Sequence, residues 1–163
     1  MNRRESLRLF AAALGGAMLG PASAADIGKR VQWSDVTLLD GRDLPATALT
    51  GRVVIVEIWA SWCPFCAQQN PLLQQLYDAQ RGRGLEFLTF SIDRDPAKAR
   101  AYIAQHHYTF PAAMATAWSR KAFGPRVGLP ELYVVDRDGG IVLKQTKEMF
   151  PEEVRELARF AQS

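Results

Sequence analysis

Two cysteines placed just after a run of β-branched residues constrain the fold of this chain more than any other feature. Residues 53–56 read VVIV, and the cysteines follow as Cys63 and Cys66. A continuous apolar run of this kind is typical of a central strand that is covered on both faces. Pro64 suits the first turn of a helix, where its missing N–H costs nothing. The segment therefore predicts a buried strand, a turn and a helix that begins at the first cysteine.

The position of Cys63 at a helix start indicates redox chemistry. The unpaired N–H groups and the dipole of the helix stabilise a thiolate there, and Cys66 follows one turn later, close enough to close a disulfide. We expect Cys63 to attack and Cys66 to resolve the mixed disulfide. Trp62 and Phe65 would give a docking protein an apolar surface. A structural disulfide and half of a metal site are the alternatives, and the strand-to-helix context favours the redox motif.

The composition of the chain excludes several classes of protein function. The chain has 163 residues, which suits one domain of ordinary size. Two cysteines supply neither a disulfide framework nor four metal ligands. The formal net charge is only +3, from 20 basic and 17 acidic residues, and arginines near the N-terminus account for most of the excess. We therefore expect no nucleic-acid partner, and we assign no cofactor and no metal to the chain.

The N-terminal residues have the organisation of a secretory signal. Three arginines within positions 2–8 precede an apolar stretch of about 11 residues, and Ala22-Ser23-Ala24 stands before a polar segment. A spanning helix needs about 20 apolar residues, so an uncleaved membrane anchor is the less favoured alternative. We predict a signal peptide over 1–24, cleaved near Ala24, and a mature domain over 25–163 in the periplasm. The paired arginines leave both Sec and Tat export open.

Hydrophobic periodicity predicts alternating strands and helices in the rest of the chain. The turn pair Asp40-Gly41 favours a short hairpin before the main domain. Between residues 108 and 130 the pattern weakens, and a short strand and a short helix fit there. The further elements that we expect are a helix from Pro64, a strand over 85–92, a helix from Pro96, strands over 132–135 and 141–143, and a helix from Pro151.

Glu57 lies at the end of the apolar run, in the strand that we expect to be buried. An isolated buried carboxylate is costly, so this side chain should bind a proton with a raised pKa. Its place on the strand that adjoins the cysteines would let it pass a proton to or from Cys66. The alternative is that Glu57 reaches water at the strand end.

Two segments resemble a known family. Residues 53–66, VVIVEIWASWCPFC, resemble the thioredoxin superfamily in its exported branch of TlpA- and ResA-like thiol–disulfide oxidoreductases, and residues 128–139, GLPELYVVDRDG, resemble the second signature of that branch. The resemblance implies an α/β thioredoxin fold: a central mixed β-sheet flanked by helices, an N-terminal β-hairpin, and an insertion before the strand that follows a cis proline. That proline is Pro130, which would face the disulfide while Leu129 pairs with the substrate backbone.

The resemblance also bears on the site residues. Glu57 matches the buried acid of the family, whereas a second glutamate of some members is replaced by Gln69, which leaves proton handling to Glu57. Pro130-Glu131 is also similar to the cytochrome c maturation type (CcmG/DsbE), which we treat as a minority reading. The expected substrate-binding residues are Trp62, Pro64, Phe65, Leu129 and Pro130.

These observations predict an exported enzyme that reduces disulfides in protein substrates. The family resemblance implies that a membrane redox partner of the DsbD/CcdA kind keeps such a reductase reduced, and a monomer is the default. An oxidase that works in the DsbA-like direction is an alternative, because the two residues between the cysteines tune the potential. A thiol peroxidase is a third reading, but the Thr-x-x-Cys arrangement of that class is missing.

The pair His106-His107 suggests an alternative function, copper binding of the Sco type. Sco-type copper proteins share the fold and use two cysteines with a distant histidine. Those proteins have three residues between the cysteines, whereas this chain has two. His106 falls on the apolar stripe of the helix from Pro96, so we expect a packed residue at the helix end. The basic and aromatic stretch 118–124 is expected to form a solvated helix with anchors in the core.

Overall fold

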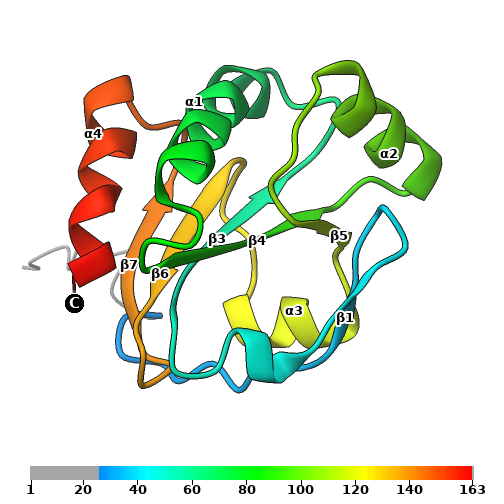
Figure 1. The fold of residues 1–163 in the computed structure, drawn as a ribbon. Coiled ribbons are helices and arrows are strands. Elements are labelled where there is room, and N and C mark those ends of the chain that lie inside the picture. Colours follow the sequence, from blue (N-terminus) through cyan, green and yellow to red (C-terminus); the bar gives the residue numbers. More distant parts are fainter. Residues whose placement is uncertain (1–25, 163) are drawn as a thin grey trace, which may run out of the picture.

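The computed structural model describes residues 26–162 of the chain (Figure 1). The predicted signal peptide over 1–24 lies outside the described residues, so its presence and cleavage stay predictions. Within residues 26–162, no helix is both long enough and apolar enough to cross a membrane.

A five-stranded mixed sheet forms the centre of the molecule (Figure 1). Its strands are β3 (Val53–Trp59), β4 (Leu85–Ser91), β5 (Ala112–Met114), β6 (Glu131–Val135) and β7 (Ile141–Thr146). The spatial order is β5-β4-β3-β6-β7. β3 runs parallel to β4 and antiparallel to β6. The strand that leads to the cysteines is therefore central, as its apolar run predicts.

Helices cover both faces of this sheet (Figure 1). They are α1 (Pro64–Gln80), α2 (Pro96–Gln105), α3 (Ala117–Phe123) and α4 (Pro151–Glu156), which continues as the 3-10 helix η2 (Leu157–Gln162). α1, α2 and α4 lie on one face, and α3 lies on the other. The second face also carries the hairpin of β1 (Val36–Thr37) and β2 (Asp43–Leu44), followed by the 3-10 turn η1 (Ala46–Ala48).

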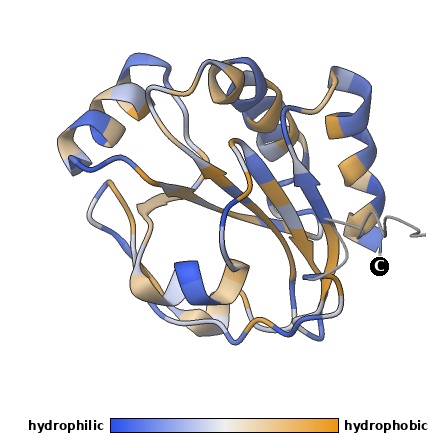
Figure 2. Cartoon of the chain, turned by 180° about the vertical axis from the view of Figure 1, so that it is seen from behind, coloured by the Kyte–Doolittle hydropathy of each residue, from blue (hydrophilic) through white to orange (hydrophobic). Residues whose placement is uncertain are grey.

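The alternation of side chains along β3 divides the core into two layers. The odd-numbered apolar residues from Val53 to Trp59 pack with α1, α2 and α4. The even-numbered residues from Val54 to Ile58 pack on the side of α3 and the hairpin. In Figure 2 the strands carry the most continuous hydrophobic colour, whereas the helices are striped. Burial of both faces explains why this strand reads as an uninterrupted apolar run.

The expected thioredoxin fold is confirmed, including the N-terminal hairpin and the insertion before the strand that follows Pro130. The insertion consists of β5 and α3. Thr116 and Ser119 cap α3 by reciprocal hydrogen bonds, which supports a helix where periodicity is weak. The C-terminal helix is α-helical only to Glu156, and Leu157, expected on its apolar face, is buried from η2 instead.

Candidate active site

Cys63 occupies the N-cap position of α1. Its Sγ accepts a hydrogen bond from the backbone N–H of Cys66 at 3.2 Å. This N–H is one of the donors that a helix start leaves without a partner, so it stabilises negative charge on the sulfur. Both cysteines are free thiols; Cys63 keeps 4% of its surface exposed, and Cys66 is fully buried. Cys63 is therefore the thiol that a partner can reach.

Cys66 lies behind Cys63 and is held as a neutral thiol. Burial raises the pKa of Cys66 far above its usual range, and the hydrogen bond with Cys63 and the charge of Glu57 act in the same direction. A thiol attacks as the thiolate, so this group needs a base before it can react. The charged group that the structure brings near Cys66 is the carboxyl group of Glu57 on β3.

Glu57 has no exposed surface. Burial raises the pKa of this carboxyl to about 8, and the hydrogen bond from Gln69 opposes the rise. The expectation of a buried acid with a raised pKa is confirmed, and the alternative of a side chain that reaches water at the strand end is wrong. At a pH near 8 both protonation states of the group are populated.

Two amide side chains of α1 surround the Glu57 carboxyl. Gln69 Nε2 donates to Glu57 Oε1 at 2.7 Å, and Gln69 Oε1 accepts from the Met149 N–H at 2.7 Å. Asn70 Nδ2 donates to Glu57 Oε2 at 2.9 Å and to the Cys66 carbonyl oxygen at 3.2 Å, and Asn70 Oδ1 accepts from the Tyr102 hydroxyl at 3.3 Å. In the sequence, Gln69 stands out only as the replacement of an acid, and no motif marks Asn70. Their positions three and four residues after Cys66, on the same helix face, are the signal that points to them.

The turn before Cys63 is fixed by Asp93, which follows β4. Its carboxylate accepts hydrogen bonds from the Ser61 N–H at 2.9 Å, from the Ser61 hydroxyl at 2.6 Å and from the Ser91 hydroxyl at 2.6 Å. Burial opposes ionisation, but these hydrogen bonds from Ser61 and Ser91 outweigh it and lower the pKa of Asp93. No motif in the sequence marks Asp93 as a residue of the site.

The Leu129–Pro130 peptide bond is cis, as the family resemblance implies. The Pro130 carbonyl oxygen accepts from the Lys147 N–H at 3.0 Å, which ties the loop before β6 to the end of β7. A pocket of about 360 Å³ lies against this loop, lined by Phe65 of α1, by residues 127–129 and by residues 146–148. The two segments that carry the resemblance thus meet at one surface.

The solvent-exposed side chains beside the thiols are largely apolar. Trp62 is 64% exposed and Phe65 is 47% exposed, and Val127 across the pocket is 71% exposed. Pro64 is exposed next to Cys63, and Leu129 is half-buried at the pocket wall. Exposed apolar side chains that gather at one place are typical of a site for a protein partner.

A second buried glutamate follows Pro130 directly. Glu131 has no exposed surface, and its Oε1 accepts from the Val127 N–H at 2.7 Å. Its Oε2 accepts at 3.0 Å from the Tyr133 hydroxyl, which also reaches the Phe123 carbonyl oxygen at 3.0 Å. These bonds tie the loop that carries Val127 to the sheet. The sequence analysis noted Pro130-Glu131 but gave Glu131 no role in the site.

His106 lies at the C-terminal end of α2, away from the cysteines in sequence. Its ring packs against Tyr102 and Tyr108, with centroids 4.5 and 5.4 Å apart, yet the residue is exposed. The expected packing at the helix end is therefore confined to these ring contacts. Among residues 26–162, no three His, Cys, Asp or Glu side chains are grouped so that they would hold a metal ion.

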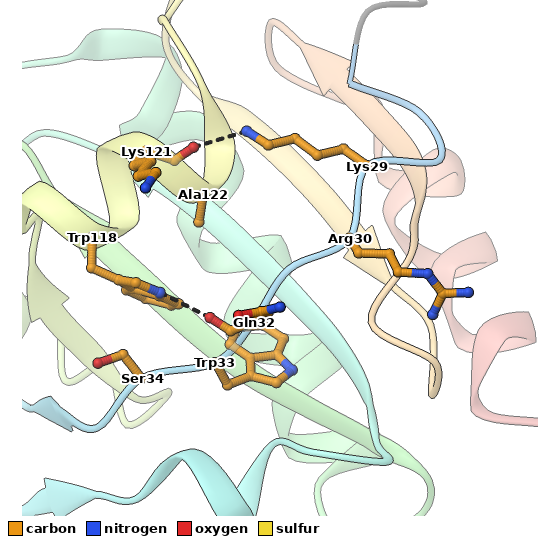
Figure 3. Close-up of a pocket in the computed structure, with 8 residues that line it drawn as sticks. All are labelled: Lys29, Arg30, Gln32, Trp33, Ser34, Trp118, Lys121 and Ala122. Atoms are coloured by element: carbon orange, nitrogen blue, oxygen red, sulfur yellow. Dashed lines mark hydrogen bonds between the residues drawn. The ribbon is translucent and has the colours of Figure 1, made fainter.

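Figure 3 shows a separate pocket of about 390 Å³ between α3 and residues 29–34. Two polar side chains of this pocket have protein partners. Trp118 Nε1 donates to the Gln32 carbonyl oxygen at 2.9 Å, and Lys29 Nζ donates to the Lys121 carbonyl oxygen at 2.8 Å. The stretch 118–124 is a helix with Phe123 in the core, as expected, and the pocket is not part of the candidate active site.

Known proteins are similar in sequence to this chain over most of its length. Residues 26–160 match the Redoxin family. The thiol-disulfide oxidoreductase ResA of Bacillus anthracis is 30% identical over 128 residues, which cover 75% of this chain and 73% of that protein. ResA of Bacillus thuringiensis subsp. konkukian is 26% identical over 137 residues, which cover 81% of this chain and 79% of that protein.

Solved structures share the fold. A thiol:disulfide interchange protein of the thioredoxin family from Chlorobium tepidum matches with a TM-score of 0.77 and 21% identity, over 83% of this chain and 97% of that chain. A secreted disulfide oxidoreductase from Mycobacterium tuberculosis, homologous to E. coli DsbE, matches with a TM-score of 0.66 and 20% identity, over 78% of this chain and 95% of that chain.

Proposed function

Because the chain belongs to the Redoxin family, in the TlpA/ResA/DsbE branch of thiol–disulfide oxidoreductases, we propose that it is an exported enzyme that reduces disulfides in protein clients through Cys63 and Cys66. The observation that carries this proposal is the placement of the two thiols. Cys63 Sγ caps α1 and accepts the Cys66 N–H, while Cys66 is buried beside a carboxyl group that can take its proton.

In the reducing direction, the Cys63 thiolate attacks a client disulfide. A bond forms between Cys63 Sγ and one client sulfur, the client S–S bond breaks, and the departing sulfur takes up a proton. Cys66 then gives its proton to the Glu57 carboxylate and attacks Cys63 Sγ, so that the second client sulfur leaves and is protonated in turn. The client gains two electrons and two protons, and the enzyme ends as the Cys63–Cys66 disulfide.

Glu57 suits the second step because its pKa of about 8 lies near neutral pH. A general base works best when its pKa is close to the pH at which it acts, since it is then both available and strong enough. The same group, once protonated, can return the proton when the enzyme is reduced again.

Client proteins dock on the apolar surface around the thiols. Trp62, Pro64 and Phe65 lie on the α1 side, and Leu129 and Pro130 lie on the loop before β6. An extended client segment that lies along Leu129 brings its disulfide to Cys63. The proposed reaction uses the Cys63–Cys66 dithiol as its reductant and assigns no role to a cofactor.

We propose export to the periplasm on the basis of the signal peptide that the sequence predicts over residues 1–24. The secreted oxidoreductase from Mycobacterium tuberculosis, a relative in fold, supports this assignment. Mass spectrometry of the protein recovered from the periplasm should find a mature chain that starts at Ala25. An intact N-terminus in the membrane fraction would instead establish an anchor.

Replacing Arg3 and Arg4 together by Lys should block export by the Tat pathway and leave Sec export unchanged.

A reductase of this kind needs a source of electrons. The oxidised Cys63–Cys66 pair must be reduced after each cycle, and a membrane thiol donor of the DsbD/CcdA kind is the partner that we propose. The enzyme acts as a monomer, because one chain carries both thiols, the carboxyl group and the docking surface.

Two substitutions test the assignment of the thiols. Cys63→Ser should abolish the enzyme's reduction of insulin in a dithiothreitol-coupled assay. Cys66→Ser should accumulate mixed disulfides with clients, because the resolving thiol is missing. Mass spectrometry identifies the linked peptides. Insulin reduction that survives Cys63→Ser would overturn the proposal, and a folded Cys66→Ser protein that traps no client would refute the role of Cys66.

A further inference from the structure

Asp93 is a buried carboxylate that the proposed reaction does not use. It follows β4 and keeps 6% of its surface exposed. Burial opposes its ionisation, yet the hydrogen bonds from Ser61 and Ser91 lower the pKa of this carboxyl, so it is charged at neutral pH. A buried charge is costly unless hydrogen bonds compensate it. A charge at this place is therefore expected to have a function beyond packing.

The turn that leads to the reactive cysteine consists of residues 60–63. It is closed by a hydrogen bond from the Cys63 N–H to the Ala60 carbonyl oxygen at 3.2 Å, so Ser61 and Trp62 are its two central residues. Cys63 is at once the last residue of this turn and the N-cap of α1, where its Sγ accepts the Cys66 N–H. The place of the reactive sulfur therefore depends on the geometry of the turn.

Asp93 binds the central residue Ser61 twice. Its Oδ2 accepts the Ser61 N–H at 2.9 Å, and its Oδ1 accepts the Ser61 hydroxyl at 2.6 Å. An O–H···O⁻ bond of this length is typical of a charge-assisted hydrogen bond, which is about twice as strong as a neutral one. One carboxylate thus holds both the backbone and the side chain of Ser61.

The Asp93 carboxylate is itself fixed by Ser91, the last residue of β4. The Ser91 hydroxyl donates to Asp93 Oδ2 at 2.6 Å and accepts from the Asp93 N–H at 3.0 Å. Next to them, the Ile92 N–H donates to the Trp59 carbonyl oxygen at 2.9 Å, which joins the end of β4 to the end of β3. Through Asp93, Ser61 is therefore connected to the central sheet.

We propose that Asp93 is a positioning residue for the nucleophile: by holding Ser61, it fixes the turn that places Cys63 Sγ at the start of α1. The same turn sets the exposed Trp62 beside the thiol. The inference rests on the proposed function, in which Cys63 attacks the client disulfide. Asp93 acts through Ser61 and takes no proton in the reaction.

The physical reason is that the rate of attack depends on how well the sulfur is placed. A misplacement of about 1 Å can slow a reaction by about a hundredfold, because the reacting atoms then meet less often in the productive geometry. Residues 60–63 lie between the end of β3 and the start of α1, so neither the sheet ladder nor the helix restrains them. The two hydrogen bonds from Ser61 to Asp93 supply this restraint instead.

The rate of attack by Cys63 tests the inference. Stopped flow measures it with an aromatic disulfide (dithiobis-nitrobenzoate) in the Cys66→Ser background, where each chain releases one coloured thiolate and the reaction stops at the mixed disulfide. Asp93→Ala should slow this step by about a hundredfold. Asp93→Asn keeps one acceptor oxygen and should slow it by about tenfold. Hydrogen exchange should find the Ser61 N–H protected in the wild type and unprotected in Asp93→Ala.

Asp95→Ala is the matched control. Asp95 also belongs to the segment after β4, but its Oδ1 accepts the Ala97 N–H at 2.9 Å and caps α2. This variant should lower the midpoint of urea denaturation, because the helix loses its cap, yet it should change the rate of attack by less than about twofold. Equal slowing in Asp95→Ala and Asp93→Ala would overturn the inference, as would a folded Asp93→Ala protein that attacks at the wild-type rate.

A pair of serine variants decides the question if Asp93→Ala does not fold. Ser61→Ala and Ser91→Ala each remove one hydroxyl that lies 2.6 Å from the Asp93 carboxylate, but only Ser61 belongs to the turn. Ser61→Ala should slow the attack by about fivefold, whereas Ser91→Ala should slow it by less than about twofold, because both bonds between Ser61 and Asp93 remain. Similar rates in the two serine variants would contradict the positioning role of Asp93.

These outcomes are distinct from the outcome for the proposed function. If the wild-type protein reduces no client disulfide, the proposed function fails, whereas the rates with the small aromatic disulfide still decide the role of Asp93. If the protein reduces clients and no Asp93 variant changes the rate of attack, only the positioning role is refuted.

Discussion

Glu57 and Glu131 are both fully buried, and they lie on neighbouring antiparallel strands at the same end of the sheet. The register pairs Glu57 with Leu132 and Ile58 with Glu131. Because paired residues share a face and successive residues alternate, the two carboxyl groups point to opposite faces of the sheet. Glu57 therefore meets α1 and the cysteines, whereas Glu131 meets the layer of α3.

The partners of the two carboxyl groups differ accordingly. Glu57 is bound by the amide side chains of Gln69 and Asn70, and its charge acts on Cys66. Glu131 accepts a backbone N–H from Val127 and the hydroxyl of Tyr133, both fixed parts of the fold. The comparison teaches that burial alone does not identify a candidate catalytic acid: Glu57 lies near a buried thiol, whereas the partners of Glu131 hold a loop in place.

The largest expected effect concerns pH and stability. Folding raises the pKa of Glu57 by burial from its ordinary 4.5 to about 8, so the folded state holds this proton more tightly than the unfolded chain. Between these values the folded state binds more protons, and the free energy of unfolding falls as the pH rises from about 4.5 to about 8, by several kcal/mol. Urea denaturation at pH 5, 7 and 9 measures this decline.

Two glutamine variants show which acid is responsible. Glu57→Gln should remove most of the decline between pH 5 and pH 9, since no proton is then gained on folding at this position. Glu131→Gln leaves Glu57 intact and should keep the decline. Equal slopes in the wild type and in Glu57→Gln would show that another group causes the pH dependence.

The second expected effect is kinetic. Glu57→Gln removes the base that we propose for Cys66 and should slow the resolution of the mixed disulfide by about a hundredfold. Glu131→Gln should change this rate by less than about threefold, because Glu131 faces the other layer of the core. Stopped-flow measurement of the resolving step on a preformed mixed disulfide gives both rates. Equal slowing by the two substitutions would break the distinction between the two acids.

The sequence alone predicts one of these acids better than the other. Glu57 follows the apolar run 53–56 and is itself followed by Ile58 and Trp59, so its burial and raised pKa could be expected from the pattern of the strand. Glu131 stands at the edge of an apolar run, where a polar residue usually reaches solvent, and its partner Val127 lies in a loop without regular structure. Its burial depends on how that loop packs, which the sequence does not encode locally.

Other contacts of the site also depend on tertiary packing, and the local sequence does not predict them. Cys63 and the helix start could be predicted because the chemistry and the capping are local. The contact of Gln69 with Met149 joins residues 80 positions apart, and Asp93 reaches Ser61 from the end of another strand. Such contacts depend on the tertiary arrangement of strands and helices, so the sequence offers no more than the helical face on which Gln69 lies.

The third expected effect is on stability at constant pH. Glu131→Ala leaves the Val127 N–H without its acceptor and removes one partner of Tyr133, which should lower the free energy of unfolding by about 1–3 kcal/mol. Glu131→Gln keeps an acceptor oxygen and should lose less. Urea denaturation at pH 7 compares the two variants. A loss in Glu131→Ala no greater than in Glu131→Gln would argue against a role of Glu131 in holding the loop.

The smallest expected effect concerns client affinity at the loop that Glu131 holds. Val127→Ala removes exposed apolar surface from the pocket beside Phe65 and should raise KM for a protein client about threefold, with kcat unchanged. Val142→Ala is the matched control, since Val142 is also exposed but lies at the opposite end of β7. A KM that rises equally in both variants would remove Val127 from the docking surface.

The reduction potential of the Cys63–Cys66 pair, titrated against glutathione, tests the central claim most directly. A reductase that passes electrons to client disulfides should have a potential near that of thioredoxin, about −270 mV, which requires a dedicated electron donor. A potential near that of DsbA, about −120 mV, would mean that the enzyme forms disulfides, and it would contradict the reducing direction proposed for this protein.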